Sequence, residues 1–298
     1  MDYLALSFEL HGLDPERAEA ACQTLGALAI TYSDSRDDAV LEPAPGEVRL
    51  WPATRLQALY AGDADALELQ RRLSGLLDLE HGRIAAQVLA DRAWEREWLR
   101  DFHALRFGRR LWVCPNHERV DEPGAVVVRL DPGLAFGTGT HPTTAMCLEW
   151  LDARLQPGAT LIDYGCGSGV LGIAAALLGA ARVDAYDIDP QALLATAENA
   201  AANGVGAHLV AHADLARLPA RTDVLMANIL AGPLAELAAD FAARIRPGGS
   251  IVLAGILAGQ AEAVADVYAP WFDMARCAKR EGWVALAGTR KSDEHGLS

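Results

Sequence analysis

The sequence predicts an α/β protein in two parts: a small α+β unit, followed by a larger domain built on a mostly parallel sheet. Two observations predict the larger domain. From about Glu118 onward, short strand-like runs alternate with helical runs, an alternation typical of a parallel sheet. Two further strand-like segments, separated by Glu281-Gly282, then predict an antiparallel hairpin at the end of that sheet.

The larger domain is expected to span residues 118–298. Its strands are expected where short apolar runs occur between turn signals. In chain order the predicted strands are Ala125–Leu130, Thr160–Tyr164, Arg182–Asp187, His208–His212, Asp223–Ile229 and Ser250–Ile256, followed by the hairpin strands Phe272–Arg280 and Trp283–Arg290.

The small N-terminal unit is expected to span residues 1–60. It has strand-like segments at Tyr3–Leu10 and Ala29–Tyr32, with a helical run, Pro15–Leu28, between them. This range holds 10 Asp or Glu against 4 Arg or Lys, a net charge of −6. An acidic unit of this kind suits a basic partner, because opposite charges assist association.

Residues 61–117 are expected to form a helical connector, with its helix around Ala85–Arg110. Trp94, Trp98 and Phe102 are spaced by four residues and would share one face of that helix. This aromatic face is expected to pack on a domain, with an exposed partner-binding surface as the alternative. Between residues 92 and 110 there are 6 Arg against 3 acids, which indicates a solvated surface, with an RNA contact as the alternative.

Composition argues against several classes of protein. The 5 cysteines include no C-x-x-C pair and no histidine at zinc-finger spacing, so neither a metal site nor a disulfide framework is expected, and a reducing cytoplasm fits. The N-terminus lacks a basic signal region, and the apolar stretch Val170–Ala181 is too short to cross a membrane. A net charge of −14 disfavours a broad phosphate-binding surface, so no sequence-specific nucleic-acid partner is expected.

The segment Asp163–Gly169, DYGCGSG, carries the strongest functional signal. It joins a short apolar strand to an apolar helical run, and glycines at such a junction let a ligand lie against the backbone. Asp187 ends the next strand, 18 residues beyond Gly169, where a carboxylate can accept hydrogen bonds from both hydroxyls of a ribose. The sequence therefore predicts a nucleoside-cofactor site. Asp189, which precedes Pro190, is expected to cap the following helix.

Two patterns compete within this turn. Gly167, Gly169 and Gly172 match the dinucleotide pattern G-x-G-x-x-G, whereas Asp163 and the alternating glycines match D-x-G-x-G-x-G, which indicates S-adenosylmethionine. The acidic residue favours the second pattern, because the methionyl part of that cofactor carries an ammonium group and has no pyrophosphate. The closing hairpin favours it as well. NAD stays open as the alternative cofactor.

A second glycine-rich segment, Asp131–Thr144, leads into the helical run Ala145–Leu155 and lacks the lysine of a phosphate-binding P-loop. It could lie over a bound cofactor, with the hydroxyl and amide of Thr144 near a carboxylate at the start of the helix. The alternative is a simple helix cap. His141 in this segment is expected to be structural and not a catalytic base.

Asn228, at the end of the predicted strand Asp223–Ile229, is the candidate catalytic residue. It would stand at the carboxyl edge of the sheet, where open α/β sheets place their reacting groups. Its side-chain oxygen could accept hydrogens from a neutral amine and orient the lone pair, with a turn cap as the alternative. Asp214 could contact an adenine amino group or cap the next turn, and the sequence favours neither.

Six segments, considered together, resemble one known family. They are Leu130–Thr144 (LDPGLAFGTGTHPTT), Asp163–Gly169 (DYGCGSG), Tyr186–Pro190 (YDIDP), Asn228–Pro233 (NILAGP), Pro247-Gly248-Gly249 and Trp94–Pro115 (WEREWLRDFHALRFGRRLWVCP). This set resembles the PrmA family, the methyltransferases of ribosomal protein L11, over nearly the whole chain. The pairing of FGTGTHPTT with NILAGP is specific, whereas many methyltransferases share the glycine turn.

The resemblance implies a Rossmann-like S-adenosylmethionine-dependent methyltransferase domain, a small ferredoxin-like N-terminal domain that recognises the substrate protein, and a flexible linker. It implies cytoplasmic methylation of lysine side chains and of the α-amino group of the basic ribosomal protein L11. The cofactor contacts would fall on Thr144, Gly165, Gly167, Asp187 and Asn228, with Phe136 nearby. The alternatives are an amino-directed methyltransferase acting on another protein or a nucleic acid, a non-catalytic ribosome-assembly factor and, more remotely, a NAD-dependent oxidoreductase.

Overall fold

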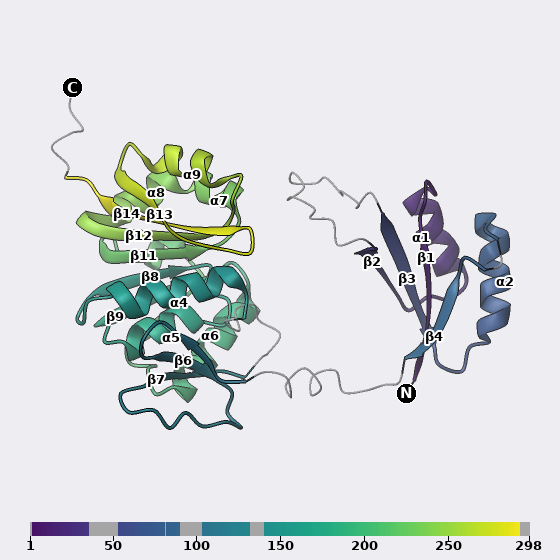
Figure 1. Ribbon diagram of the computed structural model, residues 1–298, viewed down its shortest axis with the longest axis horizontal. Helices are drawn as coiled ribbons and strands as arrows, with labels where there is room; N and C mark the ends of the chain where they lie inside the picture. Colours follow the sequence, from purple (N-terminus) through teal and green to yellow (C-terminus); the bar gives the residue numbers. More distant parts are fainter. Residues whose placement is uncertain (1, 36–52, 81, 90–102, 132–139, 293–298) are drawn as a thin grey trace. The chain divides into compact units, whose positions relative to one another are not determined.

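The computed structural model describes residues 2–35, 53–80, 82–89, 103–131 and 140–292. The chain divides into two compact units, Met1–Trp94 and Glu95–Ser298, and both are drawn in Figure 1. Each unit has a hydrophobic core of its own. Each therefore meets the physical definition of a domain.

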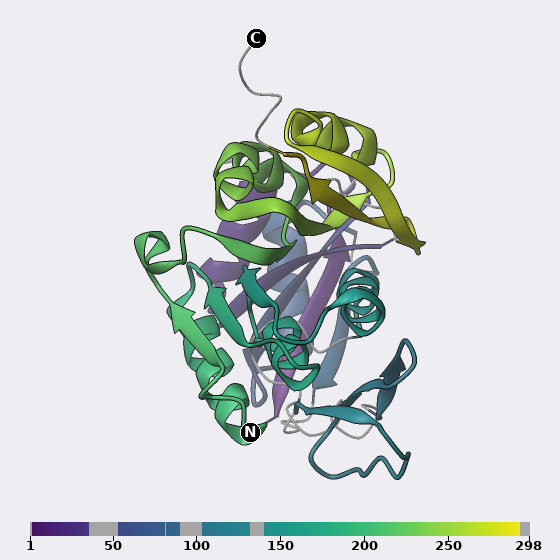
Figure 2. The same ribbon diagram turned by 90° about the vertical axis from the view of Figure 1, so that its left-hand side faces the viewer.

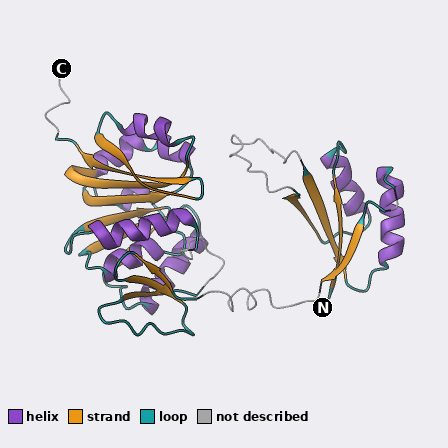
Figure 3. Cartoon of the chain, in the orientation of Figure 1, coloured by secondary structure: helices purple, strands orange, loops and turns teal. Residues whose placement is uncertain are grey.

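The N-terminal unit is a four-stranded antiparallel sheet with two helices. Its elements are β1 (Tyr3–Glu9), α1 (Pro15–Thr24), β2 (Ala29–Asp34), β3 (Thr54–Ala61), α2 (Ala66–Leu77) and β4 (Ala85–Leu89). The strand order is β2-β3-β1-β4, and each neighbouring pair is antiparallel. Figure 3 shows both helices on the same side of the sheet. This βαββαβ arrangement confirms the ferredoxin-like fold that the resemblance implied.

The local sequence explains most of these elements. Leu4, Leu6 and Phe8 alternate along β1 and are buried, at 3% exposure or less, as the two-residue period of a strand requires. Helices α1 and α2 begin after Asp14 and Asp65, whose side chains accept hydrogen bonds from backbone amides of the first turn. The local sequence therefore accounts for β1, α1 and α2.

The predicted boundary at residue 60 is wrong, because α2 and β4 belong to the N-terminal unit. β4 pairs with β1 along its full length, and α2 contributes Leu69, Leu73 and Leu77 to the same core. The helix predicted around Ala85–Arg110 is also wrong at its start, since Ala85–Leu89 is a strand. Four of the five β4 side chains are exposed, so no buried alternation marks it in the sequence. Its extended form is set by pairing with β1.

A small three-stranded sheet stands where the predicted connector ends. β5 (Leu105–Phe107) is antiparallel to β6 (Leu111–Cys114), and β6 is parallel to β7 (Val126–Arg129). β7 matches the predicted strand Ala125–Leu130, but it lies in this sheet and not in the main one, because its backbone pairs with β6. The aromatic residues of the predicted connector face lie outside the described residues: Trp94, Trp98 and Phe102.

The C-terminal unit is built on a seven-stranded sheet in the order β10-β9-β8-β11-β12-β14-β13. Its strands are β8 (Thr160–Tyr164), β9 (Arg182–Tyr186), β10 (Leu209–His212), β11 (Thr222–Asn228), β12 (Ile245–Leu257), β13 (Phe272–Arg280) and β14 (Trp283–Arg290). Strands β8 to β12 run parallel, and β14 is antiparallel to both β12 and β13. The mostly parallel sheet with a closing hairpin is thus confirmed. Figure 2 shows that hairpin, in yellow, at one end of the sheet.

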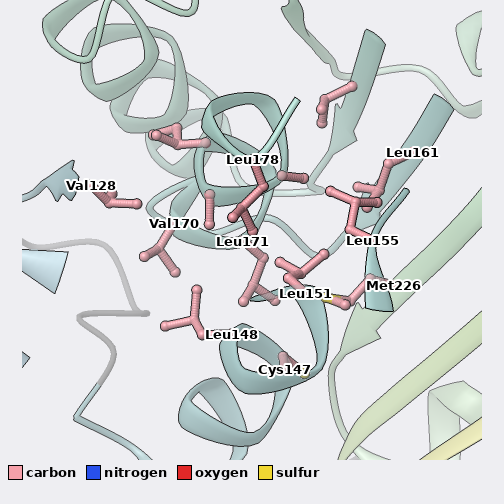
Figure 4. Close-up of a cluster of buried hydrophobic side chains, with 14 of the residues drawn as sticks. Val128, Cys147, Leu148, Leu151, Leu155, Leu161, Val170, Leu171, Leu178 and Met226 are labelled. Atoms are coloured by element: carbon pink, nitrogen blue, oxygen red, sulfur yellow. The ribbon is translucent and has the colours of Figure 1, made fainter. Parts of the chain in front are cut away.

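Helices cover both faces of this sheet. One face carries α4 (Pro142–Arg154), α5 (Val170–Leu177) and α6 (Pro190–Ala202); the other carries α7 (Ala231–Glu236), α8 (Ala238–Arg244) and α9 (Ala261–Tyr268), with the short 3-10 helix η1 (Leu215–Arg217) after β10. Figure 4 shows the first core, where Leu151 of α4 meets Leu171 of α5. In the described part of the chain, every helix is too short or too polar to span a membrane.

Candidate cofactor and acceptor site

The segment between β8 and α5 is a tight turn, as predicted. Gly165, Gly167 and Gly169 have φ angles of 73°, 55° and 80°, in the left-handed region that favours glycine. Space also excludes side chains here. A Cβ on Gly165 would lie 2.4 Å from Cγ2 of Ile229, and one on Gly169 would lie 3.0 Å from Thr196. The turn therefore presents bare backbone at the carboxyl end of β8.

Asp187 stands directly after β9, beside this turn. Its Oδ2 accepts a hydrogen bond from the Gly167 amide at 2.9 Å, and its Oδ1 accepts one from the Asp189 amide at 3.0 Å. These bonds hold the carboxylate against the turn, while each oxygen keeps a second lone pair for a ligand hydroxyl. Asp189 itself caps α6 by accepting from the Gln191 amide at 2.9 Å, which confirms its predicted role.

Asp163 lies on β8, where its side chain is 1% exposed. Its Oδ2 accepts a hydrogen bond from the Gly172 amide of α5 at 2.9 Å, and its Oδ1 has no partner among the described residues. Burial raises the pKa of this carboxyl group to about 7; the Gly172 amide opposes the shift and the charge of Asp187 adds to it. A cationic ligand group held by the turn would stabilise the ionised form, whereas an anionic pyrophosphate would destabilise it.

Ile188 is a candidate contact that the motifs did not reveal. It follows Asp187 at the carboxyl end of the sheet, and it is 85% exposed. A large apolar side chain next to the Asp187 carboxylate offers a surface against which an aromatic base can pack. Its only signal in the sequence is an apolar residue between two aspartates after a buried strand.

Asn228 and Thr144 meet at the carboxyl end of β11. The Asn228 side-chain amide donates to the Thr144 hydroxyl oxygen at 3.2 Å, across 84 residues of sequence. Thr144 is in the first turn of α4 and is 3% exposed. The next residue along from Asn228, Ile229, packs against Gly165. The structure thus brings the predicted site residues, from four different segments, to one edge of the sheet: Thr144 in α4, Gly165 and Gly167 after β8, Asp187 after β9, and Asn228 at the end of β11.

Gly255 is a second residue that no motif predicted. Its φ angle is 84°, and a Cβ on it would lie 2.2 Å from the carbonyl oxygen of Ile229. The register of β12 against β14 shifts between Leu253 and Ile256. This irregularity in β12 makes room for the chain that follows Asn228.

His141 and Asp214 both cap helices. Nδ1 of His141 accepts from the Thr143 amide at 3.3 Å at the start of α4, and the His141 ring packs edge-on against Trp283 with centroids 5.1 Å apart. The structural role predicted for His141 is confirmed. Asp214 accepts from the Ala216 amide at 2.9 Å, so the capping alternative is the one observed. Phe136 lies outside the described residues.

These groups define the class of protein. Bare backbone lies beside a carboxylate suited to a ribose, and the buried Asp163 disfavours a pyrophosphate. Gly172, the third glycine of the competing dinucleotide pattern, is explained by packing, since a Cβ there would lie 3.1 Å from Val183 and Leu209. Within the ranges that the structure describes, no three His, Cys, Asp or Glu residues form a group able to hold a metal ion. The fold and site are those of an S-adenosylmethionine-dependent methyltransferase.

Comparison with known proteins then gives the particular family. The model of the family described as ribosomal protein L11 methyltransferase (PrmA) matches residues 2–291, and the chain belongs to this family. A protein of that name from Methylococcus capsulatus is 51% identical over 285 residues, covering 94% of this chain and 97% of the relative. One from Alkalilimnicola ehrlichii is 50% identical over 277 residues, covering 92% and 94%.

A solved structure agrees with this family. The crystal structure of a ribosomal protein L11 methylase from Lactobacillus delbrueckii subsp. bulgaricus matches with a TM-score of 0.59 and 32% identity, covering 64% of this chain and 100% of that chain. The family predicted from the motifs is therefore confirmed.

Proposed function

We propose that this protein transfers methyl groups from S-adenosylmethionine to lysine ε-amino groups and to the N-terminal α-amino group of ribosomal protein L11. The family match and the names of the relatives support the substrate. One observation carries the chemistry: Asn228, whose side chain is neutral, directly follows Ala227, which pairs with Tyr164 at the start of the glycine turn. A neutral hydrogen-bonding group at that point supports an amine as the methyl acceptor.

The cofactor would be held by backbone and side chains of the turn and its neighbours. When bound, S-adenosylmethionine supplies an electrophilic methyl group on a sulfonium sulfur. Asp187 would accept from the ribose hydroxyls, and the bare backbone of Gly165 and Gly167 would leave room for the methionyl part. The Thr144 hydroxyl oxygen accepts from Asn228, so the Thr144 hydroxyl hydrogen remains to be donated to the methionyl carboxylate.

Asn228 would orient the acceptor amine. Its amide nitrogen donates to Thr144, so its Oδ1 is left to accept a hydrogen from an incoming amine. A lysine in water has a pKa of about 10.4, so only a small fraction is neutral at pH 7. The amide oxygen can aim the lone pair of that neutral form without acting as a formal base. Positioning and exclusion of water are then the main contributions of the protein.

Replacing Asn228 tests this role. Asn228→Ala should slow methylation of L11 by about 10²-fold, while binding of S-adenosylhomocysteine persists. Asn228→Asp keeps an acceptor oxygen and should retain more activity than the alanine variant. Rates come from mass spectrometry of the L11 product, and affinities from calorimetry. A rate unaffected in Asn228→Ala would remove this residue from the reaction.

The identity of the methyl acceptor is tested by a competition between possible substrates. Purified ribosomal proteins and ribosomal RNA are incubated with labelled S-adenosylmethionine, and the labelled peptides are mapped. Label on amino groups of L11 supports the proposal. Label on another protein or on RNA would overturn the L11 assignment and leave the methyltransferase chemistry standing.

We further propose that the N-terminal unit recognises the substrate, in the cytoplasm. Residues 1–94 hold 16 Asp or Glu against 8 Arg or Lys, a balance that favours association with a basic protein. The unit also has its own core, so it can act as a separate recognition module.

A further inference from the structure

A row of polar side chains on α6 faces the glycine turn. Thr196 and Asn199 are three residues apart and share one face of the helix. The Thr196 hydroxyl donates to the carbonyl oxygen of Gly167 at 3.0 Å, and the Asn199 side-chain amide donates to the carbonyl oxygen of Ser168 at 2.9 Å. Two successive carbonyl groups of the turn are therefore held by one helix that lies outside the turn.

Thr196 is completely buried, at 0% exposure. It occupies the space that Gly169 leaves free, since a Cβ on Gly169 would lie 3.0 Å from Oγ1 and Cγ2 of Thr196. Its Oγ1 also contacts Sγ of Cys166 at 3.2 Å. Threonine is a poor helix former. Its place in the middle of α6 is explained by these contacts to the turn.

Gly167 is held from two sides. Its carbonyl accepts from Thr196, and its amide donates to Oδ2 of Asp187 at 2.9 Å. Because Gly167 carries both hydrogen bonds, it links the Thr196 hydroxyl to the Asp187 carboxylate.

Asn203, at the end of α6, ties the same helix to a further segment. Its Oδ1 accepts from the Arg129 amide at 2.7 Å, and its Nδ2 donates to the Arg129 carbonyl at 2.7 Å. This pair of bonds imitates the pairing of a neighbouring strand at the end of β7. Helix α6 thereby fixes β7 relative to the glycine turn.

We propose that Thr196 and Asn199 are positioning residues for the cofactor. They hold Gly167 and Ser168 so that Asp187 is presented to the ribose, although neither touches the cofactor. This inference rests on the proposed S-adenosylmethionine site and adds to it the helix that sets its shape.

The test compares matched threonine variants by calorimetry with S-adenosylhomocysteine. Thr196→Val keeps the volume and removes the hydroxyl, so the Kd should rise about tenfold, the loss of one buried hydrogen bond. Thr196→Ser restores the hydroxyl and should stay within about twofold of wild type. Thr222→Val is the control, because Thr222 is 2% exposed and its hydroxyl donates to the Val224 carbonyl at 3.2 Å, at the opposite end of β11. Its Kd should not change.

The route through Asp187 is tested by a double-mutant cycle with Asp187→Asn. If Thr196 acts through Gly167 and Asp187, the double variant should bind about as weakly as Asp187→Asn alone. Fully additive losses would overturn that route. An unchanged Kd in Thr196→Val, or an equal loss in Thr222→Val, would overturn the proposal. If Thr196→Val fails to fold, Asn199→Ala takes its place, with an expected rise of about threefold.

Wild-type protein is the reference for the proposed function itself. Failure of the wild type to bind S-adenosylhomocysteine would refute the cofactor site. Normal wild-type binding with an unaltered Thr196→Val would refute only the positioning role. The two failures are thus distinguishable.

Discussion

Two buried aspartates, Asp163 and Asp184, have pKa values that are shifted in opposite directions. Each is 1% exposed, and they lie on the neighbouring strands β8 and β9. Burial would raise the pKa of Asp184 too, but hydrogen bonds from Arg182 and His212 outweigh it and lower that pKa. For Asp163 the single bond from the Gly172 amide is not enough, and its pKa rises to about 7. The neighbours of a buried carboxyl group therefore decide the direction of its shift.

Asp163 should make folding stability fall as the pH rises. Its pKa is about 7 in the folded protein and about 3.9 in an unfolded chain. Between these two pH values only the folded state binds the proton. The contribution of this proton to the free energy of unfolding therefore declines as the pH rises and is lost above pH 7. Asp163→Asn keeps an acceptor for the Gly172 amide and cannot ionise.

Urea denaturation of both proteins measures this effect. Between pH 5 and pH 8 the free energy of unfolding should fall by roughly 2–3 kcal/mol more in the wild type than in Asp163→Asn. Subtracting the change measured for Asp163→Asn from that of the wild type removes the contribution of the other titrating groups. Equal pH slopes would show that Asp163 is already ionised at pH 5.

At the scale of elements, the irregularity in β12 governs the placement of the chain after β11. Gly255 and Gly248 both lie in β12 with positive φ, at 84° and 76°. A Cβ on Gly255 would meet the Ile229 carbonyl at 2.2 Å, whereas nothing lies within 4 Å of a Cβ on Gly248. The two positions share the cost of a left-handed backbone and differ only in crowding.

The variants Gly255→Ala and Gly248→Ala should therefore separate the effect of backbone strain on stability from the effect of crowding on activity. Both variants should lose about 1 kcal/mol of stability from the backbone conformation alone. Gly255→Ala should also displace Ile229 and reduce the turnover of L11 methylation at least tenfold, because a displacement of about 1 Å at a reacting centre is costly. Gly248→Ala should keep turnover within about twofold. Thermal denaturation and initial rates measure the two effects, and equal turnover in both variants would contradict the argument.

At the scale of the whole molecule, the separate cores predict that the C-terminal unit folds and binds cofactor by itself. Removal of residues 1–94 takes away one complete unit. The remaining chain should bind S-adenosylhomocysteine with an affinity near that of the full protein and should not methylate L11. Calorimetry and mass spectrometry measure the two properties. Unchanged methylation of L11 would refute substrate recognition by the N-terminal unit.

A shorter deletion provides the control for that experiment. Removing only residues 1–60 would leave α2 without the sheet against which Leu69, Leu73 and Leu77 pack, and β4 without β1. An exposed apolar helix face and an unpaired strand favour aggregation. This protein should therefore be less soluble than the shorter chain that begins after residue 94. Equal solubility would argue against the assignment of α2 and β4 to the first unit.

The sequence predicted those parts whose signals are local. The turn at Asp163–Gly169, the carboxylate after β9 and the closing hairpin each follow from residues that are neighbours in the chain. The sequence pattern does not reveal β4, because its side chains are mostly exposed, and it assigns β7 to the main sheet, because a strand pattern does not specify which strand it pairs with. The sequence pattern does not reveal Ile188 or Gly255 either, because each is a single residue whose surroundings come from other elements.

By itself, therefore, the sequence determined the class of fold, the family and the glycine turn, since periodicity, glycine spacing and motif order are properties of the chain. Only the tertiary structure decided that Asn228 meets Thr144 across 84 residues and that α6 holds the turn through Thr196. Such contacts depend on which elements pack together, and packing satisfies buried polar groups with partners that are remote in the sequence.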